Sequence, residues 1–129
     1  MLKKICIGAA LCWTANILYL CLIRISELPE IKISYIDKYI HAFFYFVFSL
    51  LWFYALQFYF KKVSRKKLFV VVVLMAFVFG IAIELFQTFL TTSRSGDVID
   101  VVANTAGSLL AILLIRFLGK NLFLNKIQE

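Results

Sequence analysis

The sequence has few of the polar residues that a soluble protein needs. Among 129 residues it contains 14 Lys and Arg, 7 Asp and Glu and a single histidine, whereas 64% of its residues are hydrophobic and its mean hydropathy is +0.95. Soluble domains are roughly half apolar, so this chain cannot cover a water-facing surface. A soluble enzyme, a disordered chain and a separate soluble domain are therefore excluded.

Cysteine and proline are also scarce. The three cysteines, Cys6, Cys12 and Cys21, all lie in the first apolar run, at spacings that match neither a metal nor a redox motif. We interpret them as small packing residues, and a secreted disulfide scaffold is excluded. No apolar run alternates with polar residues, which excludes a transmembrane β-barrel.

What the sequence does contain is four long apolar runs. At roughly 20 residues per span, they predict an all-α polytopic membrane protein, because a helix satisfies its own backbone hydrogen bonds in lipid. We expect four transmembrane helices in one bundle, forming a single domain over residues 1–129. The expected spans are residues 5–23, 39–60, 68–90 and 98–118.

The basic residues predict the orientation of this bundle. Ten of the 14 Lys and Arg residues lie in the N-terminal segment, in the connection KKVSRKK and in the C-terminal segment. Four spans place these three segments on one side, and basic connections stay in the cytoplasm. We therefore expect cytoplasmic termini, a location in the inner (cytoplasmic) membrane with the lipid bilayer as partner, and no nucleic-acid partner.

Ten polar or aromatic residues then fall at the outer ends of the helices. They are Asp37, Lys38, His41 and Tyr45 at the start of the second helix, Glu84 and Gln87 at the end of the third, Arg94 and Asp97 in the following connection, and Asp100 and Asn104 at the start of the fourth. At about 100° per residue, each helix carries its polar residues on one side. We expect the three polar stripes to face one another.

Glu84 makes this arrangement an energetic requirement. It lies six residues before Leu90, roughly 9 Å below the end of its helix. A charged side chain near mid-bilayer costs on the order of 3 kcal/mol, so Glu84 must be paired, protonated or in contact with water. The small residues Ala103, Gly107 and Ala111 would let a neighbouring helix approach the fourth helix closely.

Four interpretations of the polar cluster remain open. One is a hydrogen-bonded network that only braces the helices, and another is an outward-facing pocket for a polar headgroup or a peptide-like ligand. A third is acid–base catalysis. The fourth is a divalent cation, because four carboxylates against two permanent cations leave a formal charge of −2. The candidate metal ligands are Asp37, His41, Glu84, Asp97 and Asp100.

Two segments resemble the VanZ-like family of small bacterial integral membrane proteins. The first runs from Asp37 through Lys38 and His41 to Tyr45, and the second is GIAIELFQTFLTTSRSGDVIDVVANTAG, from Gly80 to Gly107. The second matches a pattern of Gly-x-x-x-Glu-x-x-Gln, then Arg, then Asp-x-x-Asp-x-x-x-Asn-x-x-Gly. The resemblance covers about residues 26–118, and Ala111 stands where many members carry a second glycine.

The resemblance implies a role in the bacterial cell envelope, in a family named for a member associated with resistance to teicoplanin-type glycopeptides. We expect the pocket to engage a lipid-linked cell-wall precursor or a glycopeptide, without a cofactor and as a binding site rather than an enzyme. Glu84, Asp97 and Asp100 would accept hydrogen bonds from the ligand, and Lys38 and Arg94 would hold an anionic group. Gln87, Asn104 and His41 would orient these groups. The alternatives are a hydrolase or transferase acting on an envelope lipid, and a structural subunit. The oligomeric state does not follow from the sequence.

Overall fold

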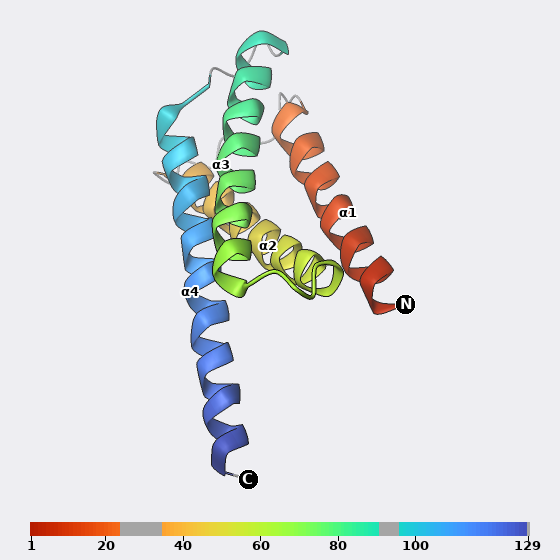
Figure 1. Cartoon of the computed structure of the whole chain (residues 1–129). Helices are drawn as coiled ribbons and strands as arrows, with labels where there is room; N and C mark the ends of the chain where they lie inside the picture. Colours follow the sequence, from red (N-terminus) through yellow and green to blue (C-terminus); the bar gives the residue numbers. More distant parts are fainter. Residues whose placement is uncertain (24–34, 91–95, 129) are drawn as a thin grey trace.

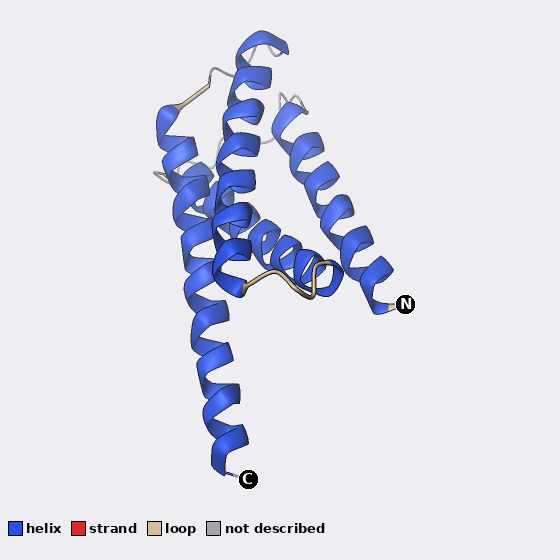
Figure 2. Cartoon of the chain, in the orientation of Figure 1, coloured by secondary structure: helices blue, strands red, loops and turns tan. Residues whose placement is uncertain are grey.

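The chain folds into four helices. The computed structural model describes residues 1–23, 35–90 and 96–128, with side chains up to residue 119. Within these residues there are helices and short connections but no strand (Figure 2). All four helices are long and apolar enough to cross a membrane, so the predicted all-α, multi-pass fold is confirmed. The helices are α1 (Leu2–Leu22), α2 (Ile36–Tyr59), α3 (Arg65–Leu90) and α4 (Val98–Gln128).

The helices extend beyond the apolar runs. The first three each begin three residues before the corresponding apolar run, and α4 continues ten residues past residue 118. Apolar runs mark the part of a helix that meets hydrocarbon, whereas the backbone hydrogen-bonding pattern continues into the polar flanks. Basic residues such as Arg65 are therefore part of a helix rather than of a connection.

Consecutive helices run in alternating directions (Figure 1). The end of α1, the start of α2, the end of α3 and the start of α4 consequently lie together, and side-chain contacts among Cys21, Lys38, Gln87 and Asp97 join them. Both chain termini lie toward the opposite end, where α4 projects beyond the other helices (Figure 1). This up-and-down topology gathers the predicted polar stripes at one end of the bundle.

The closest helix packing joins α2 and α4. A Cβ atom placed on Gly107 would overlap the backbone of Ala42, so glycine is required for this approach. Ser108, the residue after Gly107, accepts a hydrogen bond over 2.7 Å from Ser49 Oγ, and both serines are fully buried. Small residues and interhelical hydrogen bonds are the usual means by which membrane helices associate. Gly107, in the small-residue run predicted for the fourth helix, therefore lies in the contact between α2 and α4.

Aromatic side chains of α2 fill the space between the remaining helices. Phe48 stacks on Phe79 of α3 with ring centroids 5.5 Å apart, and Phe53 stacks on Phe69 at 5.0 Å. Other aromatics, such as Phe43 at the outer surface of α2, are more than half exposed and would face lipid. The aromatics of α2 thus serve both helix packing and contact with lipid.

Candidate functional site

A polar cavity opens at the end of the bundle where the predicted residues meet. Its volume is about 550 Å³, and six of the ten predicted residues line it. The complete lining is Leu20, Cys21, Asp37, Lys38, Ile40, His41, Phe44, Gln87, Gly96, Asp97 and Asp100. All four helix ends and the turn before α4 contribute to it. Small-molecule sites typically have volumes of about 300–1,000 Å³, so this cavity is large enough for a headgroup.

Lys38 stands at the centre of the cavity's charged groups. Its ammonium donates hydrogen bonds to Asp37 at 2.7 Å, to Asp97 at 2.7 Å and to Asp100 at 2.5 Å. An ammonium group has three donors, so all three are occupied. Lys38 was expected to hold an anionic group of a ligand. In the structure its three donors are taken by carboxylates of α2, α4 and the turn before α4, and its contact with a ligand stays a prediction.

Asp97 caps helix α4. Its Oδ1 accepts a hydrogen bond from the backbone N–H of Ile99 at 2.8 Å, as an N-cap carboxylate does, and its Oδ2 accepts from Lys38. The hydrogen bond from Lys38, together with the one from Ile99, holds the pKa of the Asp97 carboxyl below its ordinary value of 3.8. Asp97 is therefore an anion over the whole physiological range of pH.

The turn before α4 is fastened to the end of α3. Glu84 Oε2 accepts a hydrogen bond from the backbone N–H of Asp97 at 2.8 Å, and the Thr88 hydroxyl accepts one from the N–H of Gly96 at 2.9 Å. A Cβ atom on Gly96 would lie 2.8 Å from the carbonyl oxygen of Glu84, so only glycine fits here.

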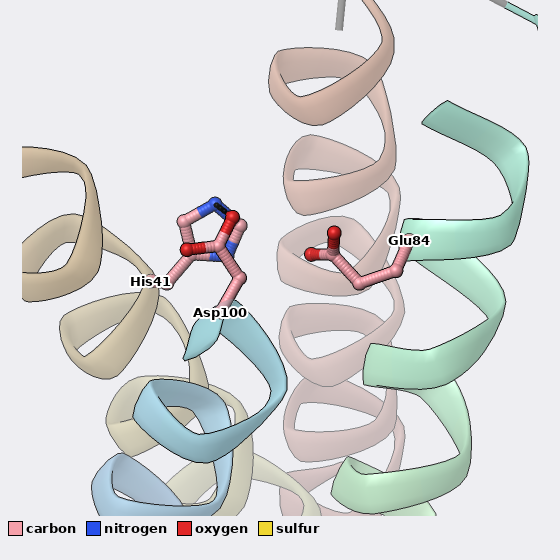
Figure 3. A group of neighbouring side chains, drawn as sticks. All are labelled: His41, Glu84 and Asp100. Carbon is pink, nitrogen blue, oxygen red and sulfur yellow. Dashed lines mark ion pairs between the residues drawn. The ribbon is translucent and has the colours of Figure 1, made fainter. Parts of the chain in front are cut away.

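Beneath the cavity wall lies a more deeply buried polar layer. His41 and Asp100 line the cavity but are only 6% and 8% exposed, and Glu84 and Asn104 lie behind them at 7% and 0%. His41 Nδ1 lies 3.1 Å from Asn104 Oδ1, and His41 Nε2 lies 3.7 Å from Asp100 Oδ2. Glu84 reaches from α3 toward both (Figure 3). Three helices thus meet through charged or hydrogen-bonding side chains.

Gln87 attaches α1 to the cavity. Its Nε2 donates a hydrogen bond over 2.9 Å to the carbonyl oxygen of Cys21, in the last turn of α1. Carbonyl groups in that turn have no partner within the helix, and Gln87 supplies one. Gln87 was predicted as an orienting residue of the site, and the structure places it in the cavity wall.

One predicted residue, Tyr45, lies apart from the cavity. Tyr45 is fully buried one turn deeper on α2, where it packs against Phe48 and Phe79, and its hydroxyl has no hydrogen-bond partner in the part of the chain that the structure describes. Arg94 lies outside the described residues. The predicted role of Arg94 as a holder of an anionic group therefore stays a prediction.

Several contributors were not foreseen from the sequence. Cys21 and Phe44 line the cavity, and Ser49 and Ser108 form the buried pair below it. The serines carried a usable signal, because Ser108 lies four residues after Asn104, one turn further along the same stripe. Cys21 and Phe44 carried none, since both are apolar residues in apolar runs.

The cavity is acidic overall. Among the described residues, four carboxylates of Asp37, Glu84, Asp97 and Asp100 face one ammonium, that of Lys38, and His41 counts as neutral, so the formal charge is −3. Such a site attracts cations and groups that donate hydrogen bonds, for example amines and hydroxyls. It repels phosphate and carboxylate unless a cation accompanies them.

Comparison with known proteins identifies the family of the chain. The family model for VanZ/LLP1 matches residues 8–119, which cover α2 and α3 in full, most of α1 and α4, and every described side chain of the site. Neither the curated proteins nor the solved structures contain a significant match to the chain. With the larger part of its length matched, the chain belongs to the VanZ/LLP1 family of membrane proteins.

Proposed function

We propose that this protein binds the headgroup of an envelope lipid or of a lipid-linked cell-wall precursor, at the extracytoplasmic end of its bundle in the bacterial inner membrane. The observation that carries the proposal is the cavity of about 550 Å³ lined by Lys38 and three aspartates at one end of the helices. Intramembrane ionisable residues are rare and usually mark a functional site.

The charge of the cavity favours a particular part of such a ligand. Because Lys38 is already paired with Asp37, Asp97 and Asp100, the free acceptor positions of these carboxylates are what a ligand meets. Sugar hydroxyls and amino groups, which a cell-wall precursor carries, donate hydrogen bonds to carboxylates. We therefore expect the sugar–peptide portion, rather than a phosphate, to lie among the aspartates.

An apolar groove beside the cavity suits the lipid portion. The groove has a volume of about 580 Å³ and is lined by α1, α2 and α3, including Phe48 and Trp52. Phe44 lines the polar cavity and Phe48 lines the groove, one helical turn apart on α2. A ligand with a polar headgroup and a hydrocarbon tail matches two adjacent sites of this kind better than a soluble ligand does.

Native mass spectrometry of the protein in mild detergent tests the proposal. The probes are a lipid-linked disaccharide–peptide precursor and phosphatidylglycerol. We expect the wild type to retain the precursor in preference to phosphatidylglycerol, and the double variant Asp37→Asn/Asp97→Asn to lose this preference. The matched control is Lys61→Gln, at an exposed position in the connection between α2 and α3. Equal retention of both lipids by the wild type would refute the proposal.

A link to glycopeptide resistance is a separate part of the proposal. If the pocket competes for the precursor that teicoplanin-type drugs recognise, expression of the chain in a susceptible bacterium should raise the minimum inhibitory concentration of teicoplanin. The double variant Asp37→Asn/Asp97→Asn, expressed at the same level, should not. An increase that persists in the variant would separate resistance from the pocket.

A membrane-embedded hydrolase or transferase is the second candidate. The observation that favours it is Glu84 Oε1, a buried carboxylate oxygen to which no described residue donates a hydrogen bond, on a side chain directed toward His41 and Asp100 (Figure 3). A buried carboxylate of this kind can serve as a general acid or base. Incubation of the wild type and of Glu84→Gln with envelope lipids distinguishes the two candidates, because only an enzyme yields a new product that the variant fails to make.

A structural subunit is the third candidate, and the pairing of Lys38 across α2 and α4 favours it. Polar side chains also join membrane helices that bind nothing. For a purely structural role, Asp100→Asn/Glu84→Gln should lower the thermal stability in detergent, while the wild type retains no lipid in the mass-spectrometric experiment.

A further inference from the structure

His41, Glu84 and Asp100 form a compact group on three different helices. One ligand atom of each residue lies within 4.8 Å of the others, and all three residues are buried (Figure 3). They belong to α2, α3 and α4, so the meeting point is fixed by the packing of the whole bundle rather than by one loop. Burial of two carboxylates in so small a volume requires compensation by hydrogen bonds or by a cation.

Hydrogen bonds satisfy only one of the two carboxylate oxygens of Glu84. Its Oε2 accepts a hydrogen bond from the backbone N–H of Asp97, but its Oε1 is buried and has no partner among the described residues. Buried polar atoms in native proteins are almost always paired, so this oxygen marks a position where something else binds. The side chain is 7% exposed and points from α3 toward His41 and Asp100 (Figure 3).

The orientation of the imidazole points to the same position. His41 Nδ1 faces the amide oxygen of Asn104 at 3.1 Å, and an amide oxygen only accepts hydrogen bonds. A neutral ring that donates from Nδ1 to this oxygen presents the lone pair of Nε2 to Asp100 Oδ2, 3.7 Å away. Two acceptors that face each other at this distance need a positive charge between them, which either a proton or a metal ion supplies. Histidines that bind metals commonly donate their second ring N–H in this way.

Lys38 does not provide that cation. Its ammonium contacts Asp100 Oδ1, whereas Oδ2 of the same carboxylate faces His41. Its three donors are occupied by Asp37, Asp97 and Asp100. The described part of the site keeps a formal charge of −3, which a divalent ion would reduce to −1.

We propose that His41 Nε2, Glu84 Oε1 and Asp100 Oδ2 bind one divalent transition-metal ion, with Zn²⁺ preferred to Mg²⁺ because one of the ligands is an imidazole. Zinc bonds to nitrogen and oxygen of about 2.0–2.2 Å place tetrahedral ligand atoms roughly 3.4 Å apart. The 3.7 Å between His41 and Asp100 already approaches this value, and small side-chain rotations would bring Glu84 into range. His41 and Asp100 also line the cavity, so the fourth position of the ion would face it.

The metal site goes beyond the proposed function and does not depend on it. All three ligands are side chains in or behind the wall of the cavity, so the ion would bind whether or not the cavity holds a headgroup. Its test is titration of the purified protein in detergent, after treatment with EDTA, with ZnCl₂, MnCl₂ and MgCl₂ by calorimetry. We expect one equivalent of Zn²⁺, bound at least about 100-fold more tightly than Mg²⁺. Loss of a second-shell partner typically weakens metal binding by up to about 100-fold. Because Glu84 and His41 would bind the ion directly, Glu84→Gln and His41→Asn should each weaken Zn²⁺ binding by at least about 100-fold.

Asp37→Asn is the matched control. Asp37 contacts Lys38 like Asp100 does, but it is not among the three ligands, so its replacement should change the affinity for Zn²⁺ by less than about fivefold. Because Cys21 also lines the cavity, Co²⁺ is titrated as a spectroscopic probe. We expect nitrogen and oxygen ligation without a sulfur-to-cobalt charge-transfer band.

Folding is monitored independently of metal binding. Zn²⁺ should raise the thermal unfolding temperature of the wild type, since a ligand that binds only the folded state stabilises it, and Mg²⁺ should not. This comparison uses the wild type alone and stands even where a variant unfolds. The proposal is overturned by absence of Zn²⁺ binding and of the thermal shift, by a sulfur charge-transfer band with Co²⁺, or by equal losses of affinity in Asp37→Asn and Glu84→Gln.

Discussion

Lys38 is the residue on which the charged part of the cavity depends. Its side chain is 17% exposed and contacts Asp97, at 41% exposed, and Asp100, at 11%. Removing one partner of a buried ion pair costs about 3–5 kcal/mol because the other charge stays buried. The aspartates are unequally buried here, so the cost lies below that range.

We therefore expect Lys38→Gln to destabilise the protein by about 2–3 kcal/mol, since Asp100 loses its partner in a nearly buried position while Asp37 and Asp97 can turn to water. Chemical unfolding of the wild type and the variant in the same detergent measures the difference. Lys61→Gln, at the other end of the bundle, serves as the control and should change the stability little. A Lys38 variant as stable as the control would show that the ion pairs contribute nothing to the fold.

Lys38→Gln should also change the pKa of Asp97. The pKa of Asp97 is lowered in the folded protein, first by its hydrogen bond from Lys38. Stability from this interaction is complete above the ordinary pKa of 3.8 and is lost as the pH falls through the lower folded value. Carboxyl ¹³C NMR titration should place the pKa of Asp97 closer to its ordinary value in Lys38→Gln than in the wild type. An unchanged pKa would contradict the assigned cause.

The sequence predicts which residues meet at this end but not how they pair. Lys38 and Asp100 each fall at a helix end that the topology brings to the same side, and that much follows from the apolar runs. The sharing of one ammonium by three carboxylates depends on side-chain rotamers and on the approach of α2 to α4. The buried serine pair of Ser49 and Ser108 was missed because a serine within a helix can also satisfy its hydroxyl on its own backbone.

At the scale of the element, the contact between α2 and α4 sets the geometry of the site. Gly107 permits this contact because its missing Cβ leaves room for the backbone of Ala42. His41 on α2 and Asn104 on α4 meet only one turn from this point. The distance between the two helices therefore decides whether the imidazole and the amide remain within hydrogen-bonding distance.

Gly107→Ala should consequently destabilise the bundle by about 1–3 kcal/mol, the usual cost of overpacking, and should disturb the environment of His41. Gly8→Ala on α1 is the matched control, because nothing lies within 4 Å of a Cβ placed there. Replacing glycine with alanine in a helix otherwise stabilises it by about 0.5–1 kcal/mol. Thermal unfolding in detergent and the ¹H–¹⁵N spectrum of the histidine ring measure the two effects. Equal stability of the two variants would contradict the close approach.

The helices themselves were predictable, and their ends were not. Continuous apolar runs of about 20 residues leave no alternative to helix in lipid, so number, type and order follow from the sequence. The helix start at Arg65 and the extension of α4 to Gln128 lie in polar flanks, where hydropathy carries no signal. There, backbone hydrogen bonding continues without apolar residues to mark it.

At the scale of the whole molecule, the polar cavity and the basic connection KKVSRKK lie at opposite ends of the bundle. The ends of α1 and α3 and the starts of α2 and α4 surround the cavity, whereas the connection joins the other ends of α2 and α3. Basic connections remain on the cytoplasmic side. The proposed orientation therefore directs the cavity away from the cytoplasm.

Cysteine labelling in whole cells tests this orientation. Tyr35 is 64% exposed at the start of α2, and Lys61 is exposed in the connection between α2 and α3. In a chain whose native cysteines are replaced by serine, Tyr35→Cys should react with a membrane-impermeant maleimide, and Lys61→Cys should react only after permeabilisation. The reverse pattern would place the cavity in the cytoplasm and exclude binding of an extracytoplasmic headgroup.

The most direct test of the proposed function is photo-crosslinking in living cells whose cell-wall sugars are radiolabelled. A photoreactive amino acid replaces Ile40, which lines the cavity, or Leu113, which is 59% exposed on α4 and lies away from the cavity. We expect the crosslinker at position 40 to capture a radiolabelled lipid-linked precursor, and the crosslinker at position 113 to capture only unlabelled phospholipid. Absence of label at position 40, or equal label at both positions, would contradict the assignment of this cavity as a binding site for an envelope lipid.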